Sequence, residues 1–156
     1  MATYQFRLAQ PADRAWLDHA VVASAWETLA DEQRRIVHPG FVAQQARSQL
    51  LQAIGMPGGA LLVATWGGLP VGYLFIAVGP DSTTEEPTVH LTDLWVHPSH
   101  RRRGVASTLL QVGERMAAAH GLEKVKIWTG LHNRAAVALA EAHGFKPAGL
   151  IGVKDL

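Results

Sequence analysis

The chain has 156 residues, 48% of them hydrophobic and 17% charged, with a formal net charge of +1 and no cysteine. This length and composition predict one globular domain, residues 1–156, that needs neither a disulfide nor a structural metal. The small net charge argues against nucleic-acid or acidic-membrane binding, and the missing thiol excludes thiolate zinc sites and a cysteine nucleophile. The N-terminal residues contain no basic or long apolar segment, which predicts an untargeted, soluble, cytoplasmic protein.

The first part of the chain predicts one strand followed by two helices. Tyr4 to Leu8 is a short extended segment, and Pro11 and Asp13 are good starting residues for a helix. Apolar residues then recur at helical spacing in two stretches, separated by the polar segment Thr28 to His38. The first stretch contains Trp16, Leu17, Ala20 and Val21, and the second, opening near Pro39, contains Phe41, Val42, Ala46, Leu50, Leu51 and Ile54.

Three β-rich segments follow and predict an antiparallel meander. Ala60 to Trp66 and Val71 to Val78 are joined by Gly67-Gly68-Leu69-Pro70, which has the length and composition of a hairpin connection. After a turn-rich stretch, the third segment runs from Thr88 to Val96 and ends before Pro98. These three segments are expected to form the centre of a sheet.

Helices and strands alternate in the rest of the chain. We expect a helix over Gly104 to His120, a strand over Lys124 to Thr129, a helix over Asn133 to His143 and a last strand over Phe145 to Val153. The whole order is then β-α-α-β-β-β-α-β-α-β. It predicts an α/β fold with a mixed, mainly antiparallel sheet flanked by helices.

The informative motif is the passage from the strand ending at Val96, through a short basic loop, into the helix that begins near Gly104. The first turn of a helix offers unpaired N–H groups and a partial positive charge, so it suits a diphosphate. Gly104 and Ala106 leave the backbone accessible, and three arginines supply planar donors: Arg101, Arg102 and Arg103. A solvated basic turn or a nucleic-acid patch is the alternative interpretation.

Arg101-x-x-Gly104-x-Ala106, directly after a strand, resembles the acyl-CoA loop of the GNAT superfamily of acetyltransferases. Leu94-x-Val96-x-Pro98 before it and Asn133-x-x-Ala136-x-x-Leu139 with His143-Gly144-Phe145 after it also agree. The resemblance extends from about Tyr4 to the end of the chain. It implies a GNAT fold and an enzyme that moves an acetyl group from acetyl-CoA, the co-substrate, to a primary amine by direct attack in a ternary complex.

The resemblance also implies a cofactor site. In the family, acetyl-CoA enters a wedge where the fourth and fifth strands separate, and its pyrophosphate lies on the loop. Carried over residue by residue, the cofactor-binding set is Leu94, Trp95, Val96, Arg101, Arg102, Arg103, Gly104, Val105, Ala106, Ser107 and Asn133. Many members have a tyrosine that protonates the departing thiolate, but this chain has Ala140 there. A catalytically weak acyl-CoA sensor is therefore an alternative function.

Two residues of the strand from Thr88 to Val96 are candidates for the base that deprotonates the amine. His90 matches a strand position where family members place a basic residue, and a neutral imidazole accepts a proton near pH 7. Asp93 is the second candidate. Each has an ordinary structural alternative, as a hydrogen-bonded residue of a half-buried sheet. Strict alternation predicts His90, Thr92, Leu94 and Val96 on one face and Leu91, Asp93 and Trp95 on the other.

The acceptor amine is not defined by the sequence. In the family, the first pair of helices helps to form the acceptor pocket, which here contains Trp26, Glu27, Asp31, Glu32 and Phe41. Its carboxylates either attract a cationic amine or form a solvated helix face. A small molecule is the expected acceptor, with a protein N-terminus or lysine as the alternative. No metal is expected, because the eight histidines show no simple ligand spacing, and a homodimer that completes the last strand is a hypothesis.

Overall fold

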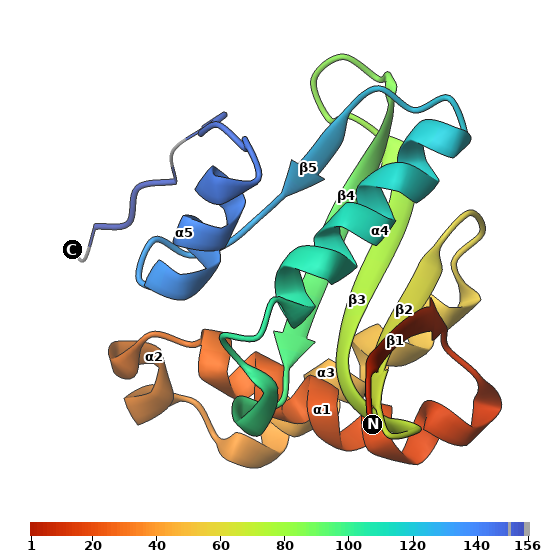
Figure 1. Ribbon diagram of the computed structural model, residues 1–156. Coiled ribbons are helices and arrows are strands. Elements are labelled where there is room, and N and C mark those ends of the chain that lie inside the picture. Colours follow the sequence, from red (N-terminus) through yellow and green to blue (C-terminus); the bar gives the residue numbers. More distant parts are fainter. Residues whose placement is uncertain (150, 155–156) are drawn as a thin grey trace.

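The computed structural model, described here for residues 1–149 and 151–154, contains a five-stranded sheet with the strand order β1-β2-β3-β4-β5 (Figure 1). The first four strands form an antiparallel meander, and β5 pairs parallel to β4. Their bounds are β1 Tyr4–Leu8, β2 Ala60–Trp66, β3 Leu69–Pro80, β4 Pro87–Val96 and β5 Val125–Ile127. The mixed, mainly antiparallel sheet flanked by helices confirms the predicted α/β class.

Helices cover both faces of the sheet. On one face lies α4 (Val105–Ala119), and on the other lie α1 (Arg14–Thr28) and α3 (Pro39–Gly55), which pack against each other (Figure 1). Two short 3₁₀ helices, Pro11–Asp13 and Pro98–His100, precede α1 and the loop before α4, and α5 (Arg134–Ala142) lies beyond β5. No helix in the described part of the chain is both long and apolar enough to cross a bilayer.

The alternation of strand residues builds a separate apolar core on each face. Leu74 and Leu91 pack with Leu109 and Leu110 of α4, whereas Tyr73 and Trp95 pack with α1 and α3. Burying one leucine of this size contributes roughly 1.5–3 kcal/mol. The two cores together fix α4 and α1 relative to β4, which carries the candidate site residues.

A bulge in β4 corrects the predicted arrangement of side chains. Phe75 pairs with Asp93, but the next residue, Ile76, pairs with Leu91, so Thr92 is an extra residue in β4. One inserted residue reverses the alternation. Leu91 consequently lies in the α4 core together with Leu94 and Val96, rather than on the face of Asp93 and Trp95. His90, opposite to Leu91 in the strand alternation, faces α1 and α3 instead of α4.

One helix forms where the sequence predicts a polar connection. The segment from Thr28 to His38 contains α2 (Asp31–Ile36). It has acidic residues in its first turn and arginines in its last turn, which complement the helix dipole, and the Gln33 side chain accepts a hydrogen bond from Ala30 N–H at 2.8 Å. These end effects stabilise a short helix that has no apolar periodicity.

The predicted last strand, Phe145 to Val153, is wrong in its described part, where no strand forms; residue 150 lies outside the described residues. Phe145 N–H donates to Ala140 O and completes the end of α5. Pro147 has no N–H to donate, and β5 offers only three residues to a further strand. Ile151 and Val153 are consequently 76% and 90% exposed.

Candidate functional site

The backbone of the basic loop turns its amides toward one side just before α4. Gly104 has φ +79°, and Arg102 has φ +60°, both in the left-handed region. Backbone in this kind of conformation forms a concave array of N–H groups, which is an anion-binding geometry. A Cβ built on Gly104 would meet nothing within 4 Å, so the space beside the backbone is open.

Six consecutive amides in this loop and helix start lack a partner. Arg101 N–H donates to Pro98 O at 3.3 Å, and the next donor along the chain is Thr108 N–H, which donates to Gly104 O at 2.9 Å. Across residues 1–149 and 151–154, no protein acceptor is found for the N–H groups of residues 102–107. These unpaired donors and the helix dipole favour an anionic group at this position.

Arg101 differs from its two neighbours because its side chain is held by the protein. Its Nε donates to Val96 O at 2.8 Å, and its Nη2 donates to Glu27 Oε2 at 2.6 Å. The guanidinium also lies 5.8 Å from the centroid of the Trp95 ring. Arg101 thus joins the loop to the end of β4 and to α1.

Arg102 and Arg103 are exposed on the loop. Burial first, and then the charges of Arg103 and His97, hold the pKa of the neighbouring His100 below its ordinary value. His100 Nδ1 lies 3.0 Å from the hydroxyl of Tyr4, which connects the loop to β1. The loop therefore combines free donors with a positive local field.

Strands β4 and β5 separate beside this loop. Their parallel pairing covers only Val89 to Leu91 of β4, and the two ribbons diverge beyond that point (Figure 1). The edge of β4 from Thr92 to Val96 consequently has no β5 partner. Asn133 stands at the start of α5 on the far side of this opening, where its Oδ1 accepts from Ala136 N–H at 3.2 Å. The predicted cofactor residues thus come from three places in the fold: the end of β4, the loop with the start of α4, and the start of α5.

Some of these residues offer only their backbone. The Val105 side chain is buried in the α4 core, so its amide alone faces the loop. The Leu94 and Val96 side chains also pack toward α4. Ser107 Oγ lies 3.1 Å from His143 Nε2, so this hydroxyl connects α4 with the end of α5.

A cavity of about 550 Å³, called the α2 cavity below, lies between the end of α1, α2 and the start of α5. Its lining carries both charge signs: the carboxylates Glu27, Asp31 and Glu32, and the guanidinium groups of Arg34 and Arg134. Asp31 pairs with Arg34, and Glu27 pairs with Arg101. His132 Nε2 lies 2.7 Å from Thr28 O and holds the two walls together. Because Glu27 also contacts Arg101 and, at 3.3 Å, Trp95 Nε1, it joins this cavity to the basic loop.

The two base candidates have different surroundings. His90 is half-buried in the middle of β4, between Ala77 of β3 and Lys126 of β5. Asp93 accepts hydrogen bonds from Ser24 Oγ at 2.8 Å and from Tyr73 Oη at 2.5 Å. Burial raises the pKa of Asp93 despite these two bonds, and burial together with the Asp93 charge raises the pKa of Tyr73.

Sequence reasoning missed three functional neighbours. The sequence contains no sign that Ser24 and Tyr73 converge on Asp93, or that Glu27 pairs with Arg101, 74 positions away. The sequence predicts Glu27 only for the acceptor pocket. Ala140, at the usual tyrosine position, is buried in α5. In the described part of the chain, no group of three or more histidine or carboxylate residues gathers as metal ligands.

Known proteins resemble this chain in sequence. The profile described as Acetyltransferase (GNAT) family matches residues 15–145. Mycothiol acetyltransferase of Parafrankia sp. (strain EAN1pec) is 34% identical over 131 residues, which cover 83% of this chain and 37% of that protein. Human N-acetyltransferase 8 is 35% identical over 69 residues, which cover 44% of this chain and 30% of that protein. The chain therefore spans about a third of the length of these relatives.

Solved structures share the fold at low sequence identity. A putative acetyl transferase from Pyrococcus furiosus superposes with a TM-score of 0.82 at 17% identity, covering 99% of this chain and 100% of that one. The aminoglycoside acetyltransferase AAC(6')-Iy, in complex with a bisubstrate analogue of CoA and acetylneamine, gives 0.75 at 18% identity, covering 99% of both chains. At these identities, the structures support the fold alone.

Proposed function

This chain belongs to the acetyltransferase (GNAT) family, and we propose that it transfers an acetyl group from acetyl-CoA to the primary amine of a small molecule. The proposed transfer is direct, within a ternary complex, and the lack of a cysteine nucleophile is consistent with it. The observation that carries this proposal is the run of unpaired amides from 102 to 107 beside the open edge of β4. The unpaired amides suit a diphosphate, and the open strand edge suits an extended chain that contains amide groups.

These residues fit CoA chemically. The 102–107 amides would hold the pyrophosphate, Arg102 and Arg103 would contribute charge, and the backbone of Leu94, Trp95 and Val96 would pair with the pantetheine. Asn133 would bind the same arm from the α5 side. When bound, acetyl-CoA supplies the thioester that the amine attacks. Arg101 positions the loop, since its side chain already bonds Val96 and Glu27.

His90 is the proposed group that accepts the proton of the amine. Because of the bulge in β4, its ring lies on the face covered by α1, the helix that ends at Glu27 and Thr28. Imidazole is the side chain that most often serves as a general base in enzymes. Asp93 remains the second candidate, and its two hydroxyl donors favour a structural role for its carboxylate.

The α2 cavity is the proposed acceptor site, with a volume of about 550 Å³ that also reaches Asn133. Arginines pair with Glu27 and Asp31, so Glu32, for which the described part of the chain shows no ion pair, is the carboxylate proposed to attract a cationic small amine. Opposite charge concentrates and orients such a ligand. A protein N-terminus or lysine is the competing acceptor. Among the proteins of this fold, AAC(6')-Iy forms a complex with a bisubstrate analogue in which CoA is joined to acetylneamine, a small-molecule acceptor group.

A thiol-release assay tests the proposal. The protein is incubated with acetyl-CoA and a panel of monoamines, polyamines, an aminoglycoside, and peptides with a free N-terminus or an internal lysine. Since the chain contains no cysteine, a thiol reagent reports only released CoA. Turnover with small amines supports the proposal, and turnover with peptides alone favours the protein-directed alternative. CoA binding without turnover of any acceptor would favour the acyl-CoA sensor, the alternative suggested by Ala140 at the usual tyrosine position.

A further inference from the structure

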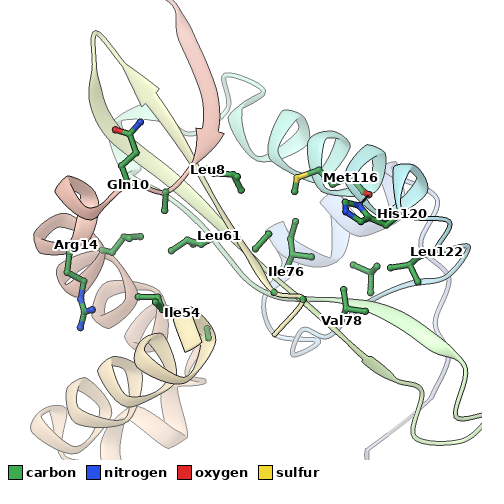
Figure 2. Close-up of a pocket in the computed structure, with 18 of the residues that line it drawn as sticks. Leu8, Gln10, Arg14, Ile54, Leu61, Ile76, Val78, Met116, His120 and Leu122 are labelled. Atoms are coloured by element: carbon green, nitrogen blue, oxygen red, sulfur yellow. Dashed lines mark hydrogen bonds between the residues drawn. The ribbon is translucent and has the colours of Figure 1, made fainter. Parts of the chain in front are cut away.

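A second, larger cavity lies at the opposite end of α4 from the basic loop. It has a volume of about 1050 Å³, at the upper end of the roughly 300–1,000 Å³ typical of small-molecule sites. Figure 2 shows its lining residues coming from the end of β1, the start of α1, the last turn of α3, the strands β2 and β3, and the end of α4. Among the described residues, none lines both this cavity and the α2 cavity of the proposed acetyl-transfer site.

The cavity exists because the sheet edge is incompletely covered. β1 ends at Leu8, opposite Leu62, so within the described chain the first two residues of β2 have no strand partner on that side beyond the bond from Ala9 N–H to Leu61 O at 2.8 Å. The connection from α3 then passes through Gly58 and Gly59, which bring no side chain. A Cβ on Gly59 would lie 3.2 Å from Met56 O, so the chain packs closely there.

Buried residues of both cores form the floor. Leu17 belongs to the α1–α3 core, and Ile76, Val89 and Ala117 belong to the α4 core. At the mouth, Leu8 and Ile54 are more than half exposed. The cavity is therefore an apolar recess that reaches past the sheet edge into the core, a shape that a flat protein surface cannot fill.

The polar side chains at the mouth carry no negative charge. Gln10, Arg14 and His120 line the cavity, and its described lining contains no carboxylate. In Figure 2, the stems of Gln10 and Arg14 border the recess, while their amide and guanidinium ends point outward from it. Arg14 Nε donates to Asp18 Oδ1 at 3.2 Å, and its side chain is 43% exposed, which leaves its terminal nitrogens accessible.

We propose that this cavity binds an amphiphile with an unbranched apolar chain and a carboxylate head. The chain lies against Leu61, Ile76 and Met116, and the carboxylate stays at the mouth beside Arg14. Apolar walls favour the chain, and a guanidinium binds a carboxylate better than it binds a cationic or neutral head of the same size. This site is independent of the proposed acetyl transfer, so either can fail alone.

Calorimetric titration with dodecanoate below its micelle concentration tests the site. The wild-type protein should bind dodecanoate at one site and bind dodecyltrimethylammonium at least about tenfold more weakly. Arg14→Gln should weaken dodecanoate binding by about tenfold. The matched Arg115→Gln, on the exposed surface of α4 and outside the lining, should not change it.

A filling variant tests the location. Ala53→Trp places an indole in the recess and should abolish binding, whereas Gln52→Trp, exposed one residue earlier and outside the lining, should not. If Ala53→Trp fails to fold, NMR contacts between the dodecanoate chain and Leu61, Ile76 and Met116 of the wild type decide the question. Equal binding of the cationic amphiphile, contacts elsewhere, or a dimer whose interface covers these residues would overturn the proposal.

Discussion

At the scale of single residues, burial decides what a carboxylate of β4 does. Both oxygens of Asp93 accept hydrogen bonds from the hydroxyls of the buried residues Ser24 and Tyr73. The pKa of its carboxyl is raised mainly by this burial. His90, three residues earlier, is half-buried like Asp93, but the described part of the chain shows no hydrogen bond to its ring, whereas two donors occupy Asp93.

Replacement of Asp93 by Asn should change the dependence of stability on pH. Because the folded pKa of Asp93 is raised, the folded protein binds this proton more tightly than the unfolded chain does. This tighter proton binding stabilises the folded state fully at a pH below the unfolded pKa of about 3.9. The stabilisation is lost as the pH rises through the folded pKa. The free energy of unfolding of the wild type minus that of Asp93→Asn should therefore fall as pH increases from about 3 toward 7.

Urea unfolding at a series of pH values measures this difference. Asp18→Asn is a suitable control, since its carboxylate is more exposed and pairs with Arg14 at the surface. If the difference in free energy of unfolding between the wild type and Asp93→Asn stays constant or grows with pH, the folded state does not bind the Asp93 proton more tightly.

His90→Ala should reduce kcat while leaving the CoA dissociation constant unchanged. General bases typically contribute about 10²- to 10⁴-fold, so we expect a loss of at least about 100-fold with the best amine. His19→Ala, on the surface of α1, is the control. An unchanged kcat for His90→Ala would remove His90 from the mechanism.

At the scale of elements, β5 depends on the turn between β3 and β4. Asp81 is buried, accepts from the N–H groups of Thr83 and Thr84, and pairs with Lys126 of β5. The hydrogen bond from Lys126 and those from the two amides hold the pKa of Asp81 well below its usual range. A second pair, Lys124 with Glu86, is exposed. The buried carboxylate is thus the main link between the turn and β5.

Asp81→Asn should lower the melting temperature and speed amide hydrogen exchange across Val125–Ile127. Removing one partner of a buried pair leaves an uncompensated polar group, whereas an exposed pair contributes little. The matched Glu86→Gln should therefore have a small effect. Since the pKa of Asp81 is depressed in the folded state, its stabilisation should also be lost as pH falls through that pKa. Equal effects of the two variants would contradict this assignment.

Elements with strong periodicity could be predicted, and those fixed by tertiary contacts could not. The four antiparallel strands and α1, α3, α4 and α5 follow from apolar spacing and from end residues such as Gly104 and Asn133. The short helix α2 has no apolar stripe. The bulge at Thr92 leaves no mark in the pattern, because apolar residues lie on both faces of β4. The residues from Phe145 onward have the composition of a strand, but in the described part of the chain they find no strand edge long enough to pair with.

At the scale of the whole molecule, the two ends of α4 have different chemistry. Its first turn follows the basic loop beside β4 (Figure 1), and its last turn borders the apolar recess at the β1–β2 edge (Figure 2). The motif around Arg101 to Ala106 made the first end predictable from sequence. The recess could not be predicted, because it arises from where β1 stops relative to β2.

CoA binding at the start of α4 is the central claim, and an amide NMR titration with CoA and with pantetheine tests it most directly. CoA should shift the amides of residues 102–107, while pantetheine, which lacks the phosphates, should not. Gly104→Val should weaken CoA binding at least about tenfold, because its side chain would crowd the diphosphate. The control Gly121→Val, at a similar left-handed position after α4, should bind CoA normally. Unshifted 102–107 amides at saturating CoA would contradict the account.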